Sequence, residues 1–261
     1  MTTVQGNNSY AYLPNIREAS WLSIAVVLVL DLLNPLLLFT QVHPLVIVFL
    51  PWVFVIGLGV FFLGKTRLSD LGIFPAKIIP AILFGLVLWV TIQIIVVVSM
   101  FLLKGEINWQ TISIGYLVDQ LLFFAISEEI IYRGFLFPQF YLKLSHGKQD
   151  SGQALWGVLV VSQVIFSISH IPNRLVNATP LQDIPFQLLL LFLSGLFFCY
   201  VYLRSQNLLA AVFVHALWNF PTILISYDAL PWYVVNLIVL GSTIILIETW
   251  QRLAFRKQKV E

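Results

Sequence analysis

Long apolar blocks alternate with short polar stretches between residues 21 and 250 of the 261-residue chain. A helix needs about 20 predominantly apolar residues to cross the hydrocarbon core of a bilayer, and each block comes close to that length. The pattern therefore predicts an all-α fold, a polytopic membrane bundle of about eight transmembrane helices. We place the spans at residues 20–40, 44–64, 78–103, 114–142, 154–171, 184–204, 207–227 and 231–250.

Basic residues gather on one side of this predicted bundle. With eight spans, the two termini and the second, fourth and sixth loops share a side, and the opposite side holds only Lys104 and Arg174. The positive-inside rule then places both termini in the cytoplasm. We expect an integral protein of a prokaryotic plasma membrane. The basic residues of the cytoplasmic side are Arg17, Lys65, Arg67, Lys77, Lys143, Lys148, Arg204, Arg252, Arg256, Lys257 and Lys259.

The composition supports a membrane protein and narrows its partners. Hydrophobic residues make up 59% of the chain and charged residues only 10%, whereas soluble domains carry roughly 25% charged residues. Cys199 is the single cysteine, which excludes an intramolecular disulfide and a multi-cysteine metal site. No basic cluster with interleaved aromatic residues indicates nucleic-acid binding. The N-terminus lacks signal-peptide features, so we expect the first span to be retained.

The stretch FFAISEEIIYRGFLF, residues 123–137, places three charges inside an apolar span. A charge at the centre of a span costs roughly 2.5–3.5 kcal/mol, so each needs a reason. Glu129 and Arg133 are four residues apart on one helix face and are predicted to form a structural ion pair. Glu128 is rotated by about 100° from Glu129 and cannot easily share that arginine. A buried network that only holds helices together would not need this second acid.

Other polar residues fall within the later spans. The seventh span contains FVHALWNF, in which His215 and Asn219 share a face, and the fifth ends in QVIFSISHIPN, in which Phe166 and His170 share a face. A carboxylate, two imidazoles and a carboxamide are sufficient to hydrolyse an amide. Glu128, His170 and His215 could instead hold a divalent metal, with zinc the first candidate, and the sequence does not decide between the two. Asp31 and Gln163 are further polar residues within spans.

Three ordered motifs carry a family resemblance. EEIIYRG at 128–134 fits an EExxxR signature, FSISH at 166–170 fits FxxxH, and HALWN at 215–219 fits HxxxN. Together they resemble the CPBP family of intramembrane proteases, which includes CaaX prenyl proteases and the bacteriocin-processing and self-immunity proteins called Abi. The resemblance implies that Glu128 and His170 activate water. It also implies that His215 and Asn219 stabilise the oxyanion, and it leaves metal dependence open.

The resemblance covers about residues 114–227 and divides the chain. We expect a three-helix region at 1–113, the catalytic core at 114–227, and a last helix with a basic tail at 228–261. The implied activity is hydrolysis of a peptide bond in a membrane-associated peptide or protein, either a lipidated CaaX-type tail or a leader peptide. The alternative is a non-catalytic membrane partner or immunity protein that uses the same polar cavity for binding.

Two points in the sequence raise further expectations. Asp31 precedes LLNP in the first span, where a transporter could use it, but no inverted repeat is present. We favour a proline-induced kink with a locally satisfied carboxylate. Helix rise places His215 about 12 Å and His170 about 24 Å from the cytoplasmic ends of their spans. The fifth span must therefore start later, tilt or bend.

Overall fold

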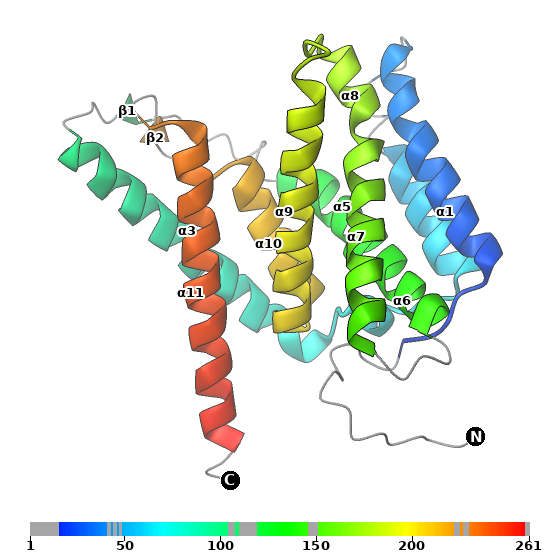
Figure 1. Cartoon of the computed structure of the whole chain (residues 1–261). Coiled ribbons are helices and arrows are strands. Elements are labelled where there is room, and N and C mark those ends of the chain that lie inside the picture. The colour runs from blue at the N-terminus through cyan, green and yellow to red at the C-terminus, as the bar shows by residue number, and fades with distance from the viewer. Residues whose placement is uncertain are drawn as a thin grey trace.

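The structure is a computed structural model that describes residues 16–40, 43, 46, 49–103, 108–109, 119–145, 151–221, 225–226 and 230–258. Helices dominate it (Figure 1). They are α1 (Trp21–Leu33), η1 (Asn34–Phe39), η2 (Pro51–Leu63), η3 (Leu68–Leu71), α3 (Pro75–Leu102), η4 (Gln120–Phe124), α5 (Ala125–Glu129), η5 (Ile130–Leu136), α6 (Phe137–Ser145), α7 (Ser151–Ser169), α8 (Ile171–Val176), α9 (Ile184–Ser205), α10 (Leu208–Asn219) and α11 (Trp232–Gln258). Two short strands, β1 (Asn108–Trp109) and β2 (Ile225–Ser226), pair antiparallel.

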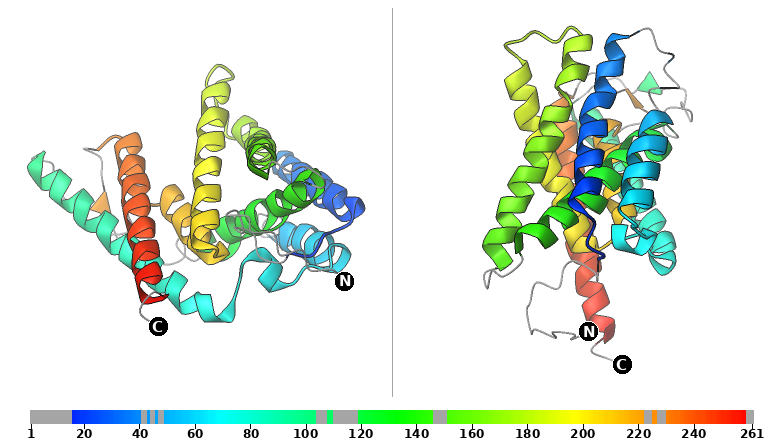
Figure 2. Two further views of the ribbon diagram at one scale, coloured as in Figure 1. Left: turned by 60° about the horizontal axis from the view of Figure 1, so that its bottom comes forward. Right: turned by 90° about the vertical axis from the view of Figure 1, so that its right-hand side faces the viewer.

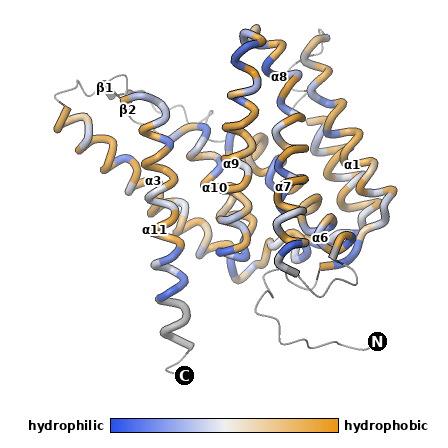
Figure 3. The backbone as a smooth tube through the Cα atoms, viewed as in Figure 1, coloured by the Kyte–Doolittle hydropathy of each residue, from blue (hydrophilic) through white to orange (hydrophobic). Residues whose placement is uncertain are grey.

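The predicted helical membrane bundle is confirmed. Within the described residues, four helical stretches are long and apolar enough to cross a bilayer, and three apolar helices are shorter. Apolar residues run along nearly the whole length of these helices, and polar residues collect near the ends (Figure 3). The long stretches are Leu68–Leu102, Gly152–Val176, Ile184–Ser205 and Trp232–Arg252, and the short ones are Trp21–Leu37, Pro51–Leu63 and Leu208–Asn219.

The seventh span is shorter than the sequence predicts. The expected helix ran from residue 207 to 227, but α10 ends at Asn219 after 12 residues. Phe220 has φ −143° and ψ 75°, because the ring of Pro221 disfavours the helical conformation in the residue before it. A helix of this length covers about 18 Å, less than the roughly 30 Å of the hydrocarbon core. The predicted extension of this helix to residue 227 is therefore wrong.

The helix that carries the glutamates lies at the centre of the bundle. On one side α1 packs against η2, and on the other α3 packs against α10 and α11 (Figures 1 and 2). α5 contacts α10 and η2, and η5 contacts α7 and α9 as well as η2. The charged side chains of this helix are therefore surrounded by protein on several sides, where partners can compensate their burial.

The helix turns around the glutamates are irregular. α5 is flanked by the π-helical segments η4 and η5, so that the short α-helical stretch Ala125–Glu129 lies between two widened segments. π-helical turns are rare and often occur at functional sites. Seven consecutive residues of η5, Ile130–Leu136, are buried, Arg133 among them.

A glycine turn before α3 fixes the start of α10. Gly72, in the segment DLGI, has φ +79°, and a Cβ atom there would lie 2.8 Å from the ring of Tyr202. The carbonyl of Gly72 accepts a hydrogen bond of 3.2 Å from the amide of Leu208, the first residue of α10. The neighbouring Leu71 is fully buried and lies close to Gly134 of the glutamate helix. This turn therefore ties α10 to the helix that carries the acids.

Candidate active site

Glu129 and Arg133 form a closed cluster in the protein interior. Their expected pairing is present, with Arg133 Nη1 3.0 Å from Glu129 Oε1, and both side chains are fully buried. The same Oε1 lies 2.7 Å from His215 Nδ1 on α10. Arg133 Nη2 donates to Gln163 Oε1 at 2.9 Å and to the carbonyl of Gly195 at 3.2 Å. The continuous helix of α5 and η5 thus meets α7, α9 and α10 at this one ion pair.

The surroundings of the cluster are shaped to fit it. The Arg133 guanidinium lies 4.3 Å from the ring centroid of Phe166 and 5.2 Å from that of Phe198. A Cβ atom on Gly195 would lie only 2.4 Å from Gln163 Oε1 and 3.1 Å from Arg133 Nη2. A glycine is therefore required at residue 195 for α9 to approach the guanidinium closely.

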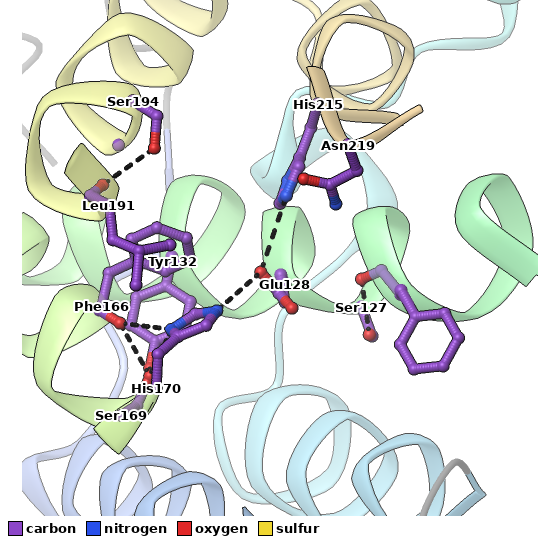
Figure 4. Close-up of polar contacts among 12 residues, drawn as sticks. Ser127, Glu128, Tyr132, Phe166, Ser169, His170, Leu191, Ser194, His215 and Asn219 are labelled. Carbon is purple, nitrogen blue, oxygen red and sulfur yellow. Dashed lines mark hydrogen bonds and ion pairs between the residues drawn. The ribbon is translucent and has the colours of Figure 1, made fainter. Parts of the chain in front are cut away.

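Glu128 points to a different environment. Its Oε2 lies 3.8 Å from His170 Nε2 and 3.7 Å from His215 Nε2, and the side chain is 29% exposed. Figure 4 shows Glu128 between the two imidazoles, one from the end of α7 and one from α10. Within the described part of the chain, Oε2 has no hydrogen-bond partner. Since Glu128 also lines a cavity, this oxygen is available to a ligand bound there.

The tautomers of the two histidines follow from their other contacts. His170 Nδ1 lies 2.8 Å from the carbonyl oxygen of Phe166, which can only accept, so Nδ1 carries a proton. His215 Nδ1 faces the carboxylate of Glu129 and donates to it. Both Nε2 atoms therefore face Glu128. In a neutral imidazole such an Nε2 accepts a hydrogen bond, and in a protonated one it donates.

Asn219 lies one turn after His215 and lines the same cavity as Glu128. Figure 4 shows its carboxamide next to His215. Its Nδ2 donates to Gln120 Oε1 at 3.1 Å. A carboxamide nitrogen has two protons, so one donor remains for a ligand. The structure thus brings Glu128, His170, His215 and Asn219, the four predicted catalytic residues, around one cavity.

Two cavities meet at Glu128 and His170, which line both. The larger has a volume of about 390 Å³ and the smaller about 240 Å³. The larger is lined by Glu128, Phe166, His170, Arg174, Gln187, Leu190, Leu191, Ser194, Phe198, His215, Trp218, Asn219, Trp232 and Asn236. Asp31, Ser127, Tyr132, Ser169 and Asn173 are among the residues that line the smaller.

Asp31 has a distant partner that the sequence does not reveal. The Tyr132 hydroxyl donates to the Asp31 carboxyl group and also lies 2.9 Å from Ser169 Oγ. Ser169 Oγ in turn lies 3.4 Å from His170 Nδ1. The helix does change at the proline, where 3₁₀ helix η1 follows α1. The carboxyl group, however, is satisfied across the bundle, so our expectation of a local partner is wrong.

The polar partners of the buried charges differ in whether the sequence alone could have indicated them. Gln163 stands out as an amide within an apolar span. Tyr132 and Ser169 carry no such signal, because either residue is common in a membrane helix. The fifth helix also departs from expectation, since α7 starts earlier than predicted, at Ser151, and stops at Ser169. The expected later start is therefore absent. The regular helix is instead broken at His170, between α7 and α8.

The fit of a metal ion can be tested on distances. Two ligands of a tetrahedral zinc ion lie about 3.4 Å apart, given bonds of about 2.1 Å. The histidine nitrogens are 3.7 and 3.8 Å from Glu128 Oε2, somewhat wider. Across the described ranges, no three His, Cys, Asp or Glu side chains are grouped so that they could hold a metal ion. The arrangement as it stands does not fit the expected set of Glu128, His170 and His215 as a zinc shell.

The fold and the site together define a class of protein. A helical membrane bundle contains a cavity in which one carboxylate faces two imidazoles and is accompanied by a carboxamide. Residues 108–221 match the model of the family described as "Type II CAAX prenyl endopeptidase Rce1-like". The matched segment contains all three motifs and confirms the resemblance to the CPBP family. No curated protein and no solved structure matches the chain.

Proposed function

We propose that the protein is an intramembrane endopeptidase that hydrolyses a peptide bond in a membrane-associated peptide or protein. The observation that carries this proposal is Glu128 Oε2, which makes no hydrogen bond within the described part of the chain and lies in a cavity between two histidine Nε2 atoms. Glu129 differs, because it is fully buried and its Oε1 contacts both Arg133 and His215, as expected for a charge that holds helices together. The family match points to the same chemistry.

Glu128 acts as the general base in this mechanism. A water molecule in the cavity donates one hydrogen bond to Glu128 Oε2 and the other to His170 Nε2, whose tautomer is held by the Phe166 carbonyl. Glu128 takes a proton as the water oxygen attacks the scissile carbonyl carbon. The resulting carboxylic acid then protonates the leaving amine nitrogen as the C–N bond breaks.

His215 and Asn219 stabilise the oxyanion that forms in between. Asn219 offers its free N–H, and His215 donates through Nε2 when that nitrogen is protonated. The Glu129 carboxylate accepts a hydrogen bond from His215 Nδ1 at 2.7 Å and holds the ring in place. Donors aimed at a developing negative charge stabilise the transition state more than the substrate.

The cavity suits an apolar peptide segment. Its wall includes Leu190, Leu191, Trp218 and Trp232 beside the polar groups. A lipidated CaaX-type tail and a leader peptide both fit this description, and we propose the CaaX-type tail because the matched family is named for it. The bilayer delivers such a substrate.

The test is cleavage by purified protein in detergent or vesicles of a peptide library that includes prenylated tails, before and after chelation. We expect cleavage that survives chelation and is lost in Glu128→Gln. Loss on chelation with recovery on added zinc would show a metal-dependent enzyme. Tight peptide binding without hydrolysis would instead support a non-catalytic membrane partner.

We also propose that the protein lies in a prokaryotic plasma membrane with both termini in the cytoplasm. The support is the eleven-to-two distribution of basic residues outside the spans. Reporter fusions after residues 70, 148 and 258 should all report a cytoplasmic location. A reporter on the opposite side at any of them would contradict this orientation.

A further inference from the structure

Arg174 is a charged residue of the larger cavity that the mechanism above does not use. It lies on α8, one turn after His170, and its amide donates to the His170 carbonyl at 3.1 Å. Its side chain lines the same cavity as Glu128, His215 and Asn219. The described part of that wall therefore contains one acid and one arginine together with the two histidines and several amides.

Within the described part of the chain, the Arg174 side chain has neither an ion-pair nor a hydrogen-bond partner. Its Nε atom is shielded from solvent and unsatisfied. Nε of Arg133 is unsatisfied too, but Arg133 and Arg204 differ from Arg174 in having a carboxylate partner. Arg133 is paired with Glu129 at 3.0 Å, and Arg204 reaches Glu248 at 2.6 Å. An unsatisfied, partly buried guanidinium is costly, and it is compensated when an anion binds.

The shape of a guanidinium favours one kind of anion. Its planar fork donates two parallel hydrogen bonds to a carboxylate, a geometry that lysine cannot match. The cavity also holds Glu128, which takes part in peptide hydrolysis if the proposed function is correct. The group that enters beside Arg174 then belongs to the peptide, and the carboxylate is the anion that a peptide carries.

We propose that Arg174 binds a carboxylate of the substrate and thereby sets which peptide bond lies at Glu128. The inference rests on the proposed function and deepens it. The carboxylate has two sources, the C-terminus of the peptide or an acidic side chain. A C-terminal carboxylate would make the enzyme cut at a fixed distance from the end of its substrate, whereas a side-chain carboxylate would select an acidic sequence.

The test compares four forms of one cleaved peptide that has a single acidic side chain: the C-terminus is free or amidated, and the side chain is the acid or its amide. For the wild type we expect kcat/KM to fall about 10- to 100-fold when the bound carboxylate is neutralised, which is the usual range for a charge-assisted hydrogen bond. In Arg174→Gln this preference should disappear while kcat on the amide form is kept. Arg174→Lys should retain part of it.

The two sources give different results. If amidation of the C-terminus lowers kcat/KM of the wild type, the terminal carboxylate is bound. If replacement of the acidic side chain by its amide lowers it, that side chain is bound. Equal loss of activity on all four peptides in Arg174→Gln would overturn the proposal, and so would a wild type without preference. Arg67→Gln is a matched control, because this exposed arginine lies outside both cavities at Glu128.

A binding measurement separates this inference from the proposed function. The Kd of the free-acid and amidated peptides is measured for Glu128→Gln and for Glu128→Gln/Arg174→Gln, neither of which needs to cleave. A preference for the acid that vanishes with Arg174 supports the carboxylate site even if no hydrolysis is found. Equal affinities in both variants would overturn it even if the wild type is an active protease.

Discussion

The two glutamates at the centre of the bundle are neighbours in sequence, yet they lie in opposite kinds of environment. Glu129 is fully buried and paired with Arg133 and His215. Glu128 is 29% exposed, and its Oε2 has no hydrogen-bond partner in the described part of the chain. A membrane protein can bury a charge when it supplies a counter-charge, as Arg133 does for Glu129, whereas Glu128 lines a cavity that a ligand can enter. His215 links the two, with Nδ1 on one acid and Nε2 facing the other.

The largest effect is expected when the carboxylate of Glu128 is neutralised. Glu128→Gln should lower kcat by about 10²–10⁴-fold, the usual contribution of a general base. The melting temperature should stay near that of the wild type, because Oε2 makes no hydrogen bond within the described part of the chain. Peptide cleavage and thermal unfolding in the same detergent measure both. Full activity of this variant would remove Glu128 from the mechanism.

Neutralising the carboxylate of Glu129 should mainly lower the stability of the folded protein. Glu129→Gln leaves Arg133 buried without its counter-charge, and breaking a buried pair in this way costs about 3–5 kcal/mol. We expect a clear drop in the melting temperature and in the folded yield. The contrast between the acids would be reversed by a Glu129→Gln protein that is as stable as the wild type but inactive, together with an active Glu128→Gln protein.

Asn219→Ala tests whether the carboxamide of Asn219 in the cavity of Glu128 stabilises a transition state. The loss of an oxyanion donor typically lowers kcat by about 10²–10³-fold, with little change in KM. The residue also bonds Gln120, so the substitution could instead loosen α10 from η4. Gln120→Ala is the control, since it removes that contact and keeps the carboxamide. Equal activity losses in both variants, counted per folded molecule, would argue against the oxyanion role.

The smallest effect is expected in the network behind His170. Tyr132→Phe removes the hydroxyl that reaches both Asp31 and Ser169. A buried acceptor left unsatisfied costs about 1–3 kcal/mol, so we expect a moderate decrease in the melting temperature. Asp31→Asn, which keeps a hydrogen-bonding group, should be milder. A double variant whose loss equals the sum of the single losses would show that the two residues do not interact.

The sequence by itself determined what depends on short spacings and composition. Hydropathy located helices at the predicted spans, and the four-residue spacing of Glu129 and Arg133 indicated their pairing. The rotation between adjacent residues already separated Glu128 from this pair, because 3.6 residues per turn is a local property of the chain. The three motifs indicated the family resemblance, which the match over residues 108–221 supports, and the residues that gather at the cavity.

Only the tertiary structure decided which distant groups meet. Nothing in the spacing shows that Glu129 also holds His215, 86 residues away, or that Asp31 is bound by Tyr132, 101 residues away. The same holds for the position of Arg174 in the cavity of Glu128. Such contacts depend on the orientation of whole helices, which results from the packing of many side chains over the entire bundle. A local sequence pattern does not contain these long-range packing interactions. For this reason the distant partners of a buried charge can be recognised only in the folded protein.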